Sequence, residues 1–329
     1  MSAGFPWLVA DIGGSNARFG WVAAAGAVVE HVQVLAVADH AGPAAAARAY
    51  LAALAQRLGA AYAAPHGAAF AVATALDGGD RVELTNGHWS FSRDAVQGEL
   101  GLDVLLVLND FEALALSLPR LHGHQLRRWP GPAEAAPDAV LAVIGPGTGL
   151  GVAGVVRAAH GWLALPGEGG HATLAPADAF ESELLNHVRR DYEHVSAERL
   201  LSGIGLPLLH RAVVAVQGAS AEPLSAEAIV EQGLAGVDPL AVRTLDAFCA
   251  LLGGFAGNVA LTLGARGGVY IGGGIVPRLG ERFFASRFRE RFEAKGRFRG
   301  YLQAIPTLLI TDTMAALDGA AQAIEQHGA

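Results

Sequence analysis

The chain contains very little cysteine and lysine. Cys249 is the single cysteine among 329 residues, which excludes an intramolecular disulfide, a zinc site built from cysteines and an iron-sulfur cluster held by this chain alone. Lys295 is the single lysine, which excludes a Walker-type phosphate loop and the strand lysine of protein kinases. If the protein handles nucleotide phosphates, we therefore expect it to use backbone N–H groups and a metal ion.

Charge is also scarce. Charged residues make up 16% of the chain against 52% hydrophobic residues, and the net charge is -8. A negative net charge argues against nonspecific nucleic-acid or anionic-membrane binding as the main role. The 43 glycines, many of them placed after apolar runs, favour an α/β enzyme that acts on a small molecule. The length suffices for two domains of ordinary size.

Neither targeting nor membrane insertion is indicated. The first residues, MSAGFPWLVAD, contain no basic residue before a short apolar run that ends at Asp11, so we expect no signal peptide. The longest uncharged stretch, 139–156, contains Pro146 and five glycines and lacks continuous apolarity, so we expect no membrane segment. With a single cysteine, the expected location is the reducing cytoplasm.

Three glycine clusters each follow an apolar, strand-like run. Residues 8–22 have the pattern strand, glycine turn, strand, and residues 140–156 repeat it, while 267–279 supply a third cluster. Two copies of one unit about 130 residues apart suggest an internally duplicated α/β fold. The spacing does not fit the Gly-x-Gly-x-x-Gly of dinucleotide-binding folds, so we interpret the first two as hairpin turns whose amides face a ligand. Each turn taken alone could be purely structural.

The remaining segments have clear local patterns. Residues 103–110 form a buried strand that runs directly into a helical pattern, so Asn109 and Asp110 lie at a strand end and a helix start. The other predictions are a helix over 43–58, strands over 67–76 and 81–86 joined by a turn at 77–80, an exposed connector over 122–138, and a mostly helical segment over 181–263.

Six motifs together resemble the bacterial glucokinase family, within the hexokinase and actin-like superfamily. In chain order they are DIGGSNARFG, LNDFEALALSLP, IGPGTGLGVA, LPGEGGHATLAP, HVSAERLLSG and IGGGIVPR. The resemblance covers the chain from about residue 8 onward. It implies a two-domain, duplicated actin-like ATPase (ribonuclease H-like) fold with an interdomain cleft. The implied small domain is 1–110 plus 313–329, and the implied large domain is 111–312.

The resemblance also implies an activity. Family members phosphorylate D-glucose at the 6-hydroxyl with ATP and Mg²⁺, which begins glycolysis, and relatives suggest a homodimer. The residues that the resemblance assigns to ATP are Ala10, Asp11, Ile12, Gly13, Gly14, Ser15, Gly145, Gly147, Thr148, Gly149, Gly272, Gly273 and Gly274. Asp11 would hold Mg²⁺ through water, and the cation would offset repulsion between the carboxylate and the phosphates. From the residues alone, Asp11 could instead be a turn-forming aspartate before Gly-Gly.

The same resemblance assigns the acceptor site. Asp110 is the expected catalytic base, and the expected sugar contacts are Asn109, Asp110, Glu168, His171 and Glu198. A carboxylate suits this work because it can orient the hydroxyl and accept its proton late in a loose transition state. Without the resemblance, Asn109 or Asp110 could simply cap the helix that begins at Phe111, and Glu198 could lie in a capped helix start.

Alternatives with the same fold stay open. One is a kinase of another hexose or of an amino sugar, and another is a kinase of the repressor, open-reading-frame and kinase family, although many of its members carry a cysteine-rich zinc motif. A third is a non-catalytic actin-like nucleotide-binding regulator, for which the acceptor residues would be unnecessary. The chain departs from the family at Ser15, where threonine is frequent, but the hydroxyl is kept.

Overall fold

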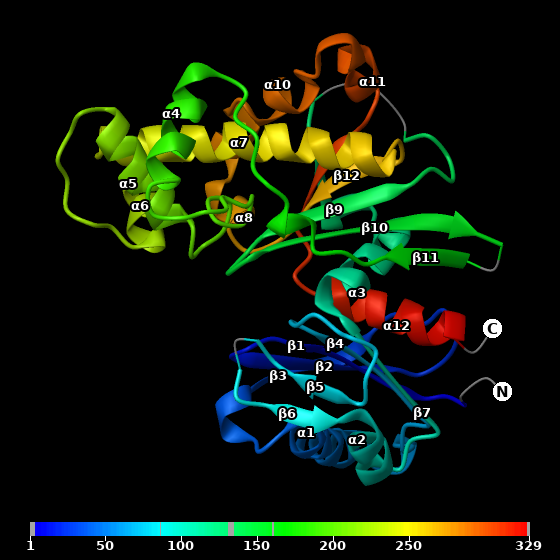
Figure 1. The fold of residues 1–329 in the computed structure, drawn as a ribbon. Coiled ribbons are helices and arrows are strands. Elements are labelled where there is room, and N and C mark those ends of the chain that lie inside the picture. Colours follow the sequence, from blue (N-terminus) through cyan, green and yellow to red (C-terminus); the bar gives the residue numbers. More distant parts are fainter. Residues whose placement is uncertain (1–3, 86, 131–134, 160, 328–329) are drawn as a thin grey trace. The chain divides into compact units, whose positions relative to one another are not determined.

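The chain folds into two compact units (Figure 1). The computed structural model describes residues 4–85, 87–130, 135–159 and 161–327. The first unit comprises residues 1–121, 157–166 and 313–329, and the second comprises 122–156 and 167–312. Each unit therefore contains segments that are far apart in the sequence.

A five-stranded sheet with the order β3-β2-β1-β4-β7 forms the centre of the first unit. β1 and β2 make an antiparallel hairpin, whereas β1, β4 and β7 run parallel to one another. The strands of this unit are β1 (Trp7–Ile12), β2 (Asn16–Val22), β3 (Glu30–Ala36), β4 (Gly67–Val72), β5 (Arg81–Glu83), β6 (Ser90–Ser92), β7 (Val104–Asn109) and β11 (Gly161–Leu165). Its helices are α1 (Pro43–Leu58), α2 (Arg93–Leu100), α3 (Asp110–Ser117) and α12 (Ala315–His327).

Local sequence signals set the helix boundaries in this unit. α1 begins at Pro43, a residue suited to the first turn, and the predicted helix over 43–58 is confirmed. α2 is capped at its start by the Ser92 hydroxyl, which accepts from the Ala95 N–H, and it ends at Gly101 in the left-handed conformation. α12 packs against α3, β1 and β4, so the end of the chain is part of the first unit.

The second unit repeats this arrangement and adds a large helical part. Five of its strands are neighbours in the order β10-β9-β12-β13-β8. These strands are β8 (Leu126–Arg128), β9 (Leu141–Pro146), β10 (Leu150–Ala158), β12 (Gly268–Ile271) and β13 (Thr307–Ile310). The helices are α4 (Ala179–Val188), α5 (Leu206–Val216), α6 (Ala226–Ala235), α7 (Pro239–Leu263), α8 (Val276–Leu279), α9 (Glu281–Ala285), α10 (Phe288–Glu293) and α11 (Arg299–Gln303).

The predicted duplication is visible in the two sheets. In the first unit an antiparallel hairpin, β2-β1, continues into the parallel strands β4 and β7. In the second unit the hairpin β10-β9 continues in the same way into the parallel strands β12 and β13. Both glycine turns thus occupy the same position in their own sheet, at the tip of the hairpin.

α7 is the long central helix of the second unit. On length and composition alone it could cross a membrane, since its most apolar 18 residues have a mean hydropathy of 1.4. However, 78% of that window is buried inside the protein, where α7 packs against α5, α6, α10 and the strands β9 and β12. Its apolar surface is therefore accounted for by burial in the core of this unit.

Two sequence predictions were wrong in detail. The run 67–76 does not form a hairpin with 81–86, because β4 ends at Val72 and lies between β1 and β7, while β5 pairs with β6. A fully buried parallel strand and a hairpin strand share the same apolar signature, so the pattern could not separate them. The connector 122–138 is also more than a surface loop, since it contains β8 and the buried Trp129, which packs on Phe283 and Phe288.

The division into units falls later than the predicted domain boundary at residue 110. α3 remains with the first unit because it packs against α12, β4 and β7. The second unit begins at His122, and the segment 157–166 is grouped with the first. The assignment of functional domains stays a prediction.

Candidate active site

The first unit brings two predicted site segments to one edge of its sheet. Ile12, Val72 and Asn109 are aligned in register across the parallel strands β1, β4 and β7. Asp11 and Asn109 therefore both lie where these strands reach their carboxyl ends. In open α/β sheets, ligands bind outside this edge.

The glycine turn of the first hairpin is tight and exposed. The Gly13 N–H donates to the Asn16 carbonyl at 2.9 Å, which leaves Gly14 and Ser15 at the centre of a four-residue turn. Ala10 and Ile12 were also predicted to contact ATP, but both side chains are fully buried in the sheet. Any contact from these two residues to a nucleotide would have to use the backbone.

Asp11 forms an ion pair that the motif comparison did not assign. Arg18 Nη1 lies 2.8 Å from Asp11 Oδ2, across the hairpin on β2. Burial raises the pKa of Asp11 above its ordinary value, and the Arg18 guanidinium opposes that shift. The signal for this pair was available in the sequence, because a hairpin that turns at Gly14 and Ser15 places residues 11 and 18 opposite each other.

The carboxylate of Asp11 fits the usual use of Mg²⁺. Within the described ranges, no three His, Cys, Asp or Glu side chains gather into a group that could hold a metal ion on their own. Mg²⁺ commonly binds one or two carboxylates together with substrate phosphates and several waters, and it does not need an all-protein cage. A single carboxylate beside a phosphate-binding turn is consistent with that pattern.

The start of α3 separates the two roles that the sequence left open. Asn109 Oδ1 accepts from the N–H of Phe111 at 2.8 Å and of Glu112 at 3.4 Å, and the Glu112 carboxylate accepts from the Asn109 N–H. Asn109 and Glu112 thus make a capping box. Asp110 also accepts from the Phe111 N–H through Oδ1, at 2.9 Å. Because Asn109 caps the helix, capping does not explain why residue 110 is an aspartate.

Two neighbours of this junction were missed by sequence reasoning. The Thr74 carbonyl accepts from Asn109 Nδ2 at 3.0 Å, which fixes which end of the amide faces the helix. The Thr74 hydroxyl is itself held by the Glu83 carbonyl and the Thr85 hydroxyl, both at 2.9 Å. Burial raises the pKa of Glu112. Neither role could be predicted, because these contacts join segments with no shared periodic pattern.

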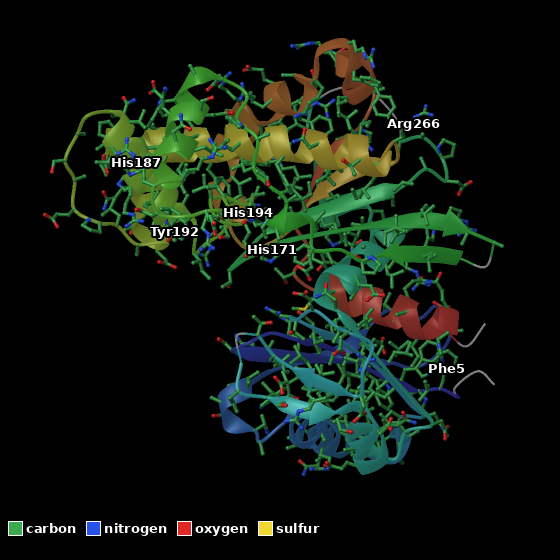
Figure 2. All side chains as sticks on the ribbon, in the orientation of Figure 1. Phe5, His171, His187, Tyr192, His194 and Arg266 are labelled. Carbon is green, nitrogen blue, oxygen red and sulfur yellow. The ribbon has the colours of Figure 1, made fainter. Side chains whose placement is uncertain are left out.

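In the second unit, three predicted sugar contacts lie together. His171 Nε2 is 3.9 Å from Glu168 Oε2 and 3.8 Å from Glu198 Oε1. The backbone aligns them, since the Glu198 N–H donates to the Gly170 carbonyl at 2.8 Å. Figure 2 labels His171 among the side chains of this unit. Two carboxylates around one imidazole offer acceptors and a donor to a polyhydroxylated ligand.

Glu198 also holds the second glycine turn. Its Oε2 accepts from the Leu150 N–H at 2.8 Å, directly after Gly149. A β-carbon at Gly149 would lie 2.5 Å from that same oxygen, so the close approach requires glycine. One carboxylate therefore connects the predicted sugar cluster with the predicted phosphate turn.

The second and third glycine clusters pack directly on each other. The Gly272 N–H donates to the Ile144 carbonyl at 2.8 Å, and the Ile275 N–H donates to the Pro146 carbonyl at 3.1 Å. Gly273 has a φ of +75°, and a β-carbon there would lie 2.4 Å from the Pro146 oxygen. The prediction that these clusters serve one ligand is consistent with this packing, although the sequence gave no sign of the contact between them.

A further segment braces the second turn. The Gly203 N–H donates to the Gly147 carbonyl at 2.7 Å, and the Ile204 N–H donates to the Thr148 carbonyl at 3.4 Å. The Ser202 hydroxyl, which is buried, donates to the Glu198 carbonyl and accepts from the Gly205 N–H. Residues 198–205 thus fasten the sugar cluster to the glycine turn within one unit.

Known proteins match the chain along nearly its whole length. The sequence profile of the glucokinase family matches residues 8–327. A glucokinase of Chromobacterium violaceum is 50% identical over 331 aligned positions, which cover 99% of this chain and 92% of that protein. A glucokinase of Aromatoleum aromaticum is 49% identical, with coverage of 98% and 95%.

Solved structures agree with the sequence matches. The crystal structure of a glucokinase from an Antarctic psychrotroph has a TM-score of 0.88 at 38% identity and covers 97% of this chain and 98% of its own. A ROK family glucokinase of Streptomyces griseus, solved with glucose and AMPPNP, shares the fold with a TM-score of 0.59 at 19% identity, and 96% and 98% of the chains are covered. The predicted duplicated actin-like ATPase fold class is thereby confirmed, and the chain belongs to the glucokinase family.

Proposed function

We propose that this protein transfers the terminal phosphoryl group of ATP to the 6-hydroxyl of D-glucose. Family membership at about half identity over the full chain supports this reaction. The structural observation that carries it is the start of α3, where Asn109 caps the helix and Asp110 is spared that task. The alternative of a regulator that only binds nucleotide leaves Asp110 and the cluster around His171 without a purpose.

Asp110 is the proposed catalytic base. It is the first residue of α3, and a helix N-terminus favours the charged form of a carboxylate. In phosphoryl transfer the transition state is loose, so the base mainly orients the attacking hydroxyl and accepts its proton late. Such a group contributes about 10² to 10⁴ in rate.

The proposed sugar site uses Asn109, Glu168, His171 and Glu198. The amide nitrogen of Asn109 carries two hydrogens, and one of them goes to the Thr74 carbonyl. The oxygen of that amide is engaged by the helix, so we expect Asn109 to act on the sugar as a donor through its second N–H. Glu168 and Glu198 would accept from sugar hydroxyls, and His171 would donate or accept.

The proposed nucleotide site uses the three glycine clusters. Backbone N–H groups of glycine turns can approach phosphates closely because no side chain intervenes. With no Walker lysine in the chain, the positive charge is expected to come from Mg²⁺, held through water by Asp11. When bound, Mg²⁺ would neutralise negative charge on the phosphates. Arg18 would keep the Asp11 carboxylate oriented toward the turn.

A coupled assay over a panel of sugars and donors tests the proposal. Glucose, mannose, fructose and glucosamine are each offered with ATP, ADP and polyphosphate, and product formation is followed. We expect the highest kcat/KM for glucose with ATP. Faster turnover of another sugar would reassign the substrate, and the absence of turnover with every pair would favour the regulator. That the protein is a homodimer and is cytoplasmic stays a prediction, and light scattering tests the first part.

A further inference from the structure

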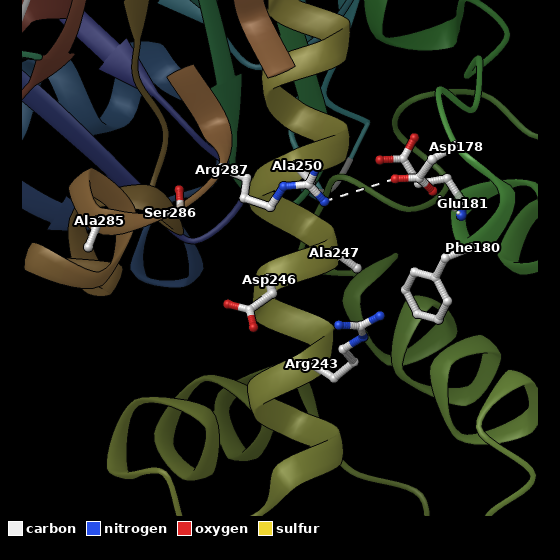
Figure 3. A pocket seen from close by; sticks show the side chains of 10 residues that line it. All are labelled: Asp178, Phe180, Glu181, Arg243, Asp246, Ala247, Ala250, Ala285, Ser286 and Arg287. Carbon is white, nitrogen blue, oxygen red and sulfur yellow. Dashed lines mark hydrogen bonds and ion pairs between the residues drawn. The ribbon is translucent and has the colours of Figure 1, made fainter. Parts of the chain in front are cut away.

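A cavity of about 260 Å³ lies in the helical part of the second unit (Figure 3). Its walls come from the first turn of α4, the middle of α7 and the turn that follows α9. It shares no residue with the proposed sugar and nucleotide sites. The cavity therefore needs an explanation of its own.

Small residues on α7 create the hollow. Arg243, Ala247 and Ala250 are spaced i, i+4 and i+7, so they share one face of this helix. Ala247 and Ala250 are buried, with exposed fractions of 6% and 4%. Because both floor residues end at the β-carbon, the space above them stays unfilled.

The carboxylates around the cavity are already engaged. Asp178 Oδ1 accepts from the Glu181 N–H at 2.9 Å, and Asp178 Oδ2 lies 3.4 Å from Arg291 Nη1. The buried Glu181 accepts from Arg291 Nη2 at 2.5 Å. Asp246 gives an oxygen to Arg282 Nη2 at 2.8 Å. Each acidic group that lines the cavity thus has a donor from the protein.

Hydrogen-bond donors, by contrast, are in surplus. The guanidinium of Arg243 lies over the Phe180 ring, 4.4 Å from its centroid, and makes no hydrogen bond or ion pair with any residue in the described part of the chain. Arg287 donates from Nε and Nη2 to Glu290, whereas its Nη1 lies 3.9 Å from Asp178, beyond hydrogen-bond distance. Figure 3 shows both guanidinium groups beside the hollow.

We propose that this cavity binds a small anion through Arg243 and Arg287. An arginine offers five N–H donors in a planar fork that suits the oxygens of a phosphate or carboxylate group, and stacking on Phe180 holds the Arg243 fork in one plane. A volume of about 260 Å³ equals roughly nine waters and falls just below the range of drug-sized pockets. The ligand is therefore a phosphorylated or carboxylated molecule of about ten non-hydrogen atoms or fewer.

Calorimetric titration of the full-length protein with inorganic phosphate and, separately, with succinate tests the proposal at constant ionic strength. Arg243→Gln removes the free fork, and Ala247→Leu fills the floor without changing charge. Arg211→Gln is the matched control, since Arg211 is an exposed arginine on α5 of the same unit and does not line the cavity. Thermal melts of all variants establish that they are folded.

We expect at least one probe to bind, with about tenfold or greater loss of affinity in Arg243→Gln and in Ala247→Leu and no change in Arg211→Gln. Binding of phosphate alone would indicate a phosphorylated ligand, and binding of succinate alone a carboxylated one. Three results would overturn the proposal: binding of neither probe, equal binding by Arg243→Gln and the wild type, or displacement of the probe by AMPPNP. If Ala247→Leu does not fold, Arg243→Gln decides.

Discussion

The two hairpins occupy the same position in two similar sheets but differ in how they are built. In β1–β2, the second residue pair from the turn is Asp11 opposite Arg18, a charged pair. In β9–β10, the corresponding pair is Gly145 opposite Gly151. The first hairpin thus carries charge at the place where the second has only backbone.

The second turn is held from outside instead. Glu198 binds the Leu150 N–H, and the N–H groups of Gly203 and Ile275 bind the carbonyls of Gly147 and Pro146. The first turn is closed by its own Gly13 N–H and supported by its own ion pair. Duplication therefore kept the scaffold while the proposed tasks diverged: one turn supplies charge for a cation, and the other supplies backbone amides tied to the sugar cluster.

The largest effect is expected from removing the charge of the first hairpin. Asp11→Asn keeps the shape of the side chain but cannot hold a cation as a carboxylate does, so we expect kcat to fall on the order of 10² or more. Steady-state kinetics over a Mg²⁺ titration measures this. Asp39→Asn, at an exposed aspartate of the same unit, is the control and should behave as the wild type. An unchanged Mg²⁺ dependence in Asp11→Asn would remove the metal role.

A smaller effect is expected at the second hairpin. Gly149→Ala places a methyl group against the Glu198 carboxylate and should displace it from the Leu150 N–H. We expect the KM for glucose to rise roughly tenfold, since about 1.4 kcal/mol of binding would be lost. Gly147→Ala is the matched variant, because no atom lies within 4 Å of a β-carbon there. Equal glucose KM values in the two variants would separate Glu198 from the glycine turn.

The smallest effect concerns stability. Burial raises the pKa of Asp11 in the folded state, so folding favours its neutral form, and its contribution to the free energy of unfolding is lost as pH rises through that raised pKa. At pH 7 the neutral Asp11→Asn should be at least as stable as the wild type. The difference should shrink as pH falls toward 3.8, the model value for an aspartate. Urea unfolding measures it, and a clear loss of stability at pH 7 would show that the ion pair with Arg18 outweighs burial.

Sequence patterns predicted the parts of the fold whose signal is local. The strands around both glycine turns and the helix over 43–58 follow from apolar periodicity with glycine and proline at the ends. β8 has three residues inside a polar segment, too short for any period to be visible. The partners of β4 depend on the whole sheet, so no window of neighbouring residues could reveal them.

The candidate site divides in the same way. The ordered motifs indicated which residues to examine, and the hairpin geometry would have been enough to pair Asp11 with Arg18. The bond between Glu198 and the Leu150 N–H joins residues 48 positions apart, and it involves a backbone group that every residue possesses. A contact of that kind leaves no trace in side-chain patterns and requires the folded chain.

The most direct test of the account compares two aspartates in the first turns of two helices. Asp110 begins α3 and is the proposed base, whereas Asp94 lies in the first turn of α2 and has no assigned role. Glucose phosphorylation is measured for Asp110→Asn and Asp94→Asn, together with glucose affinity and a thermal melt. We predict that Asp110→Asn folds, still binds glucose and loses about 10² to 10⁴ in kcat, while Asp94→Asn is unchanged. A folded Asp110→Asn with kcat near that of the wild type would contradict the account.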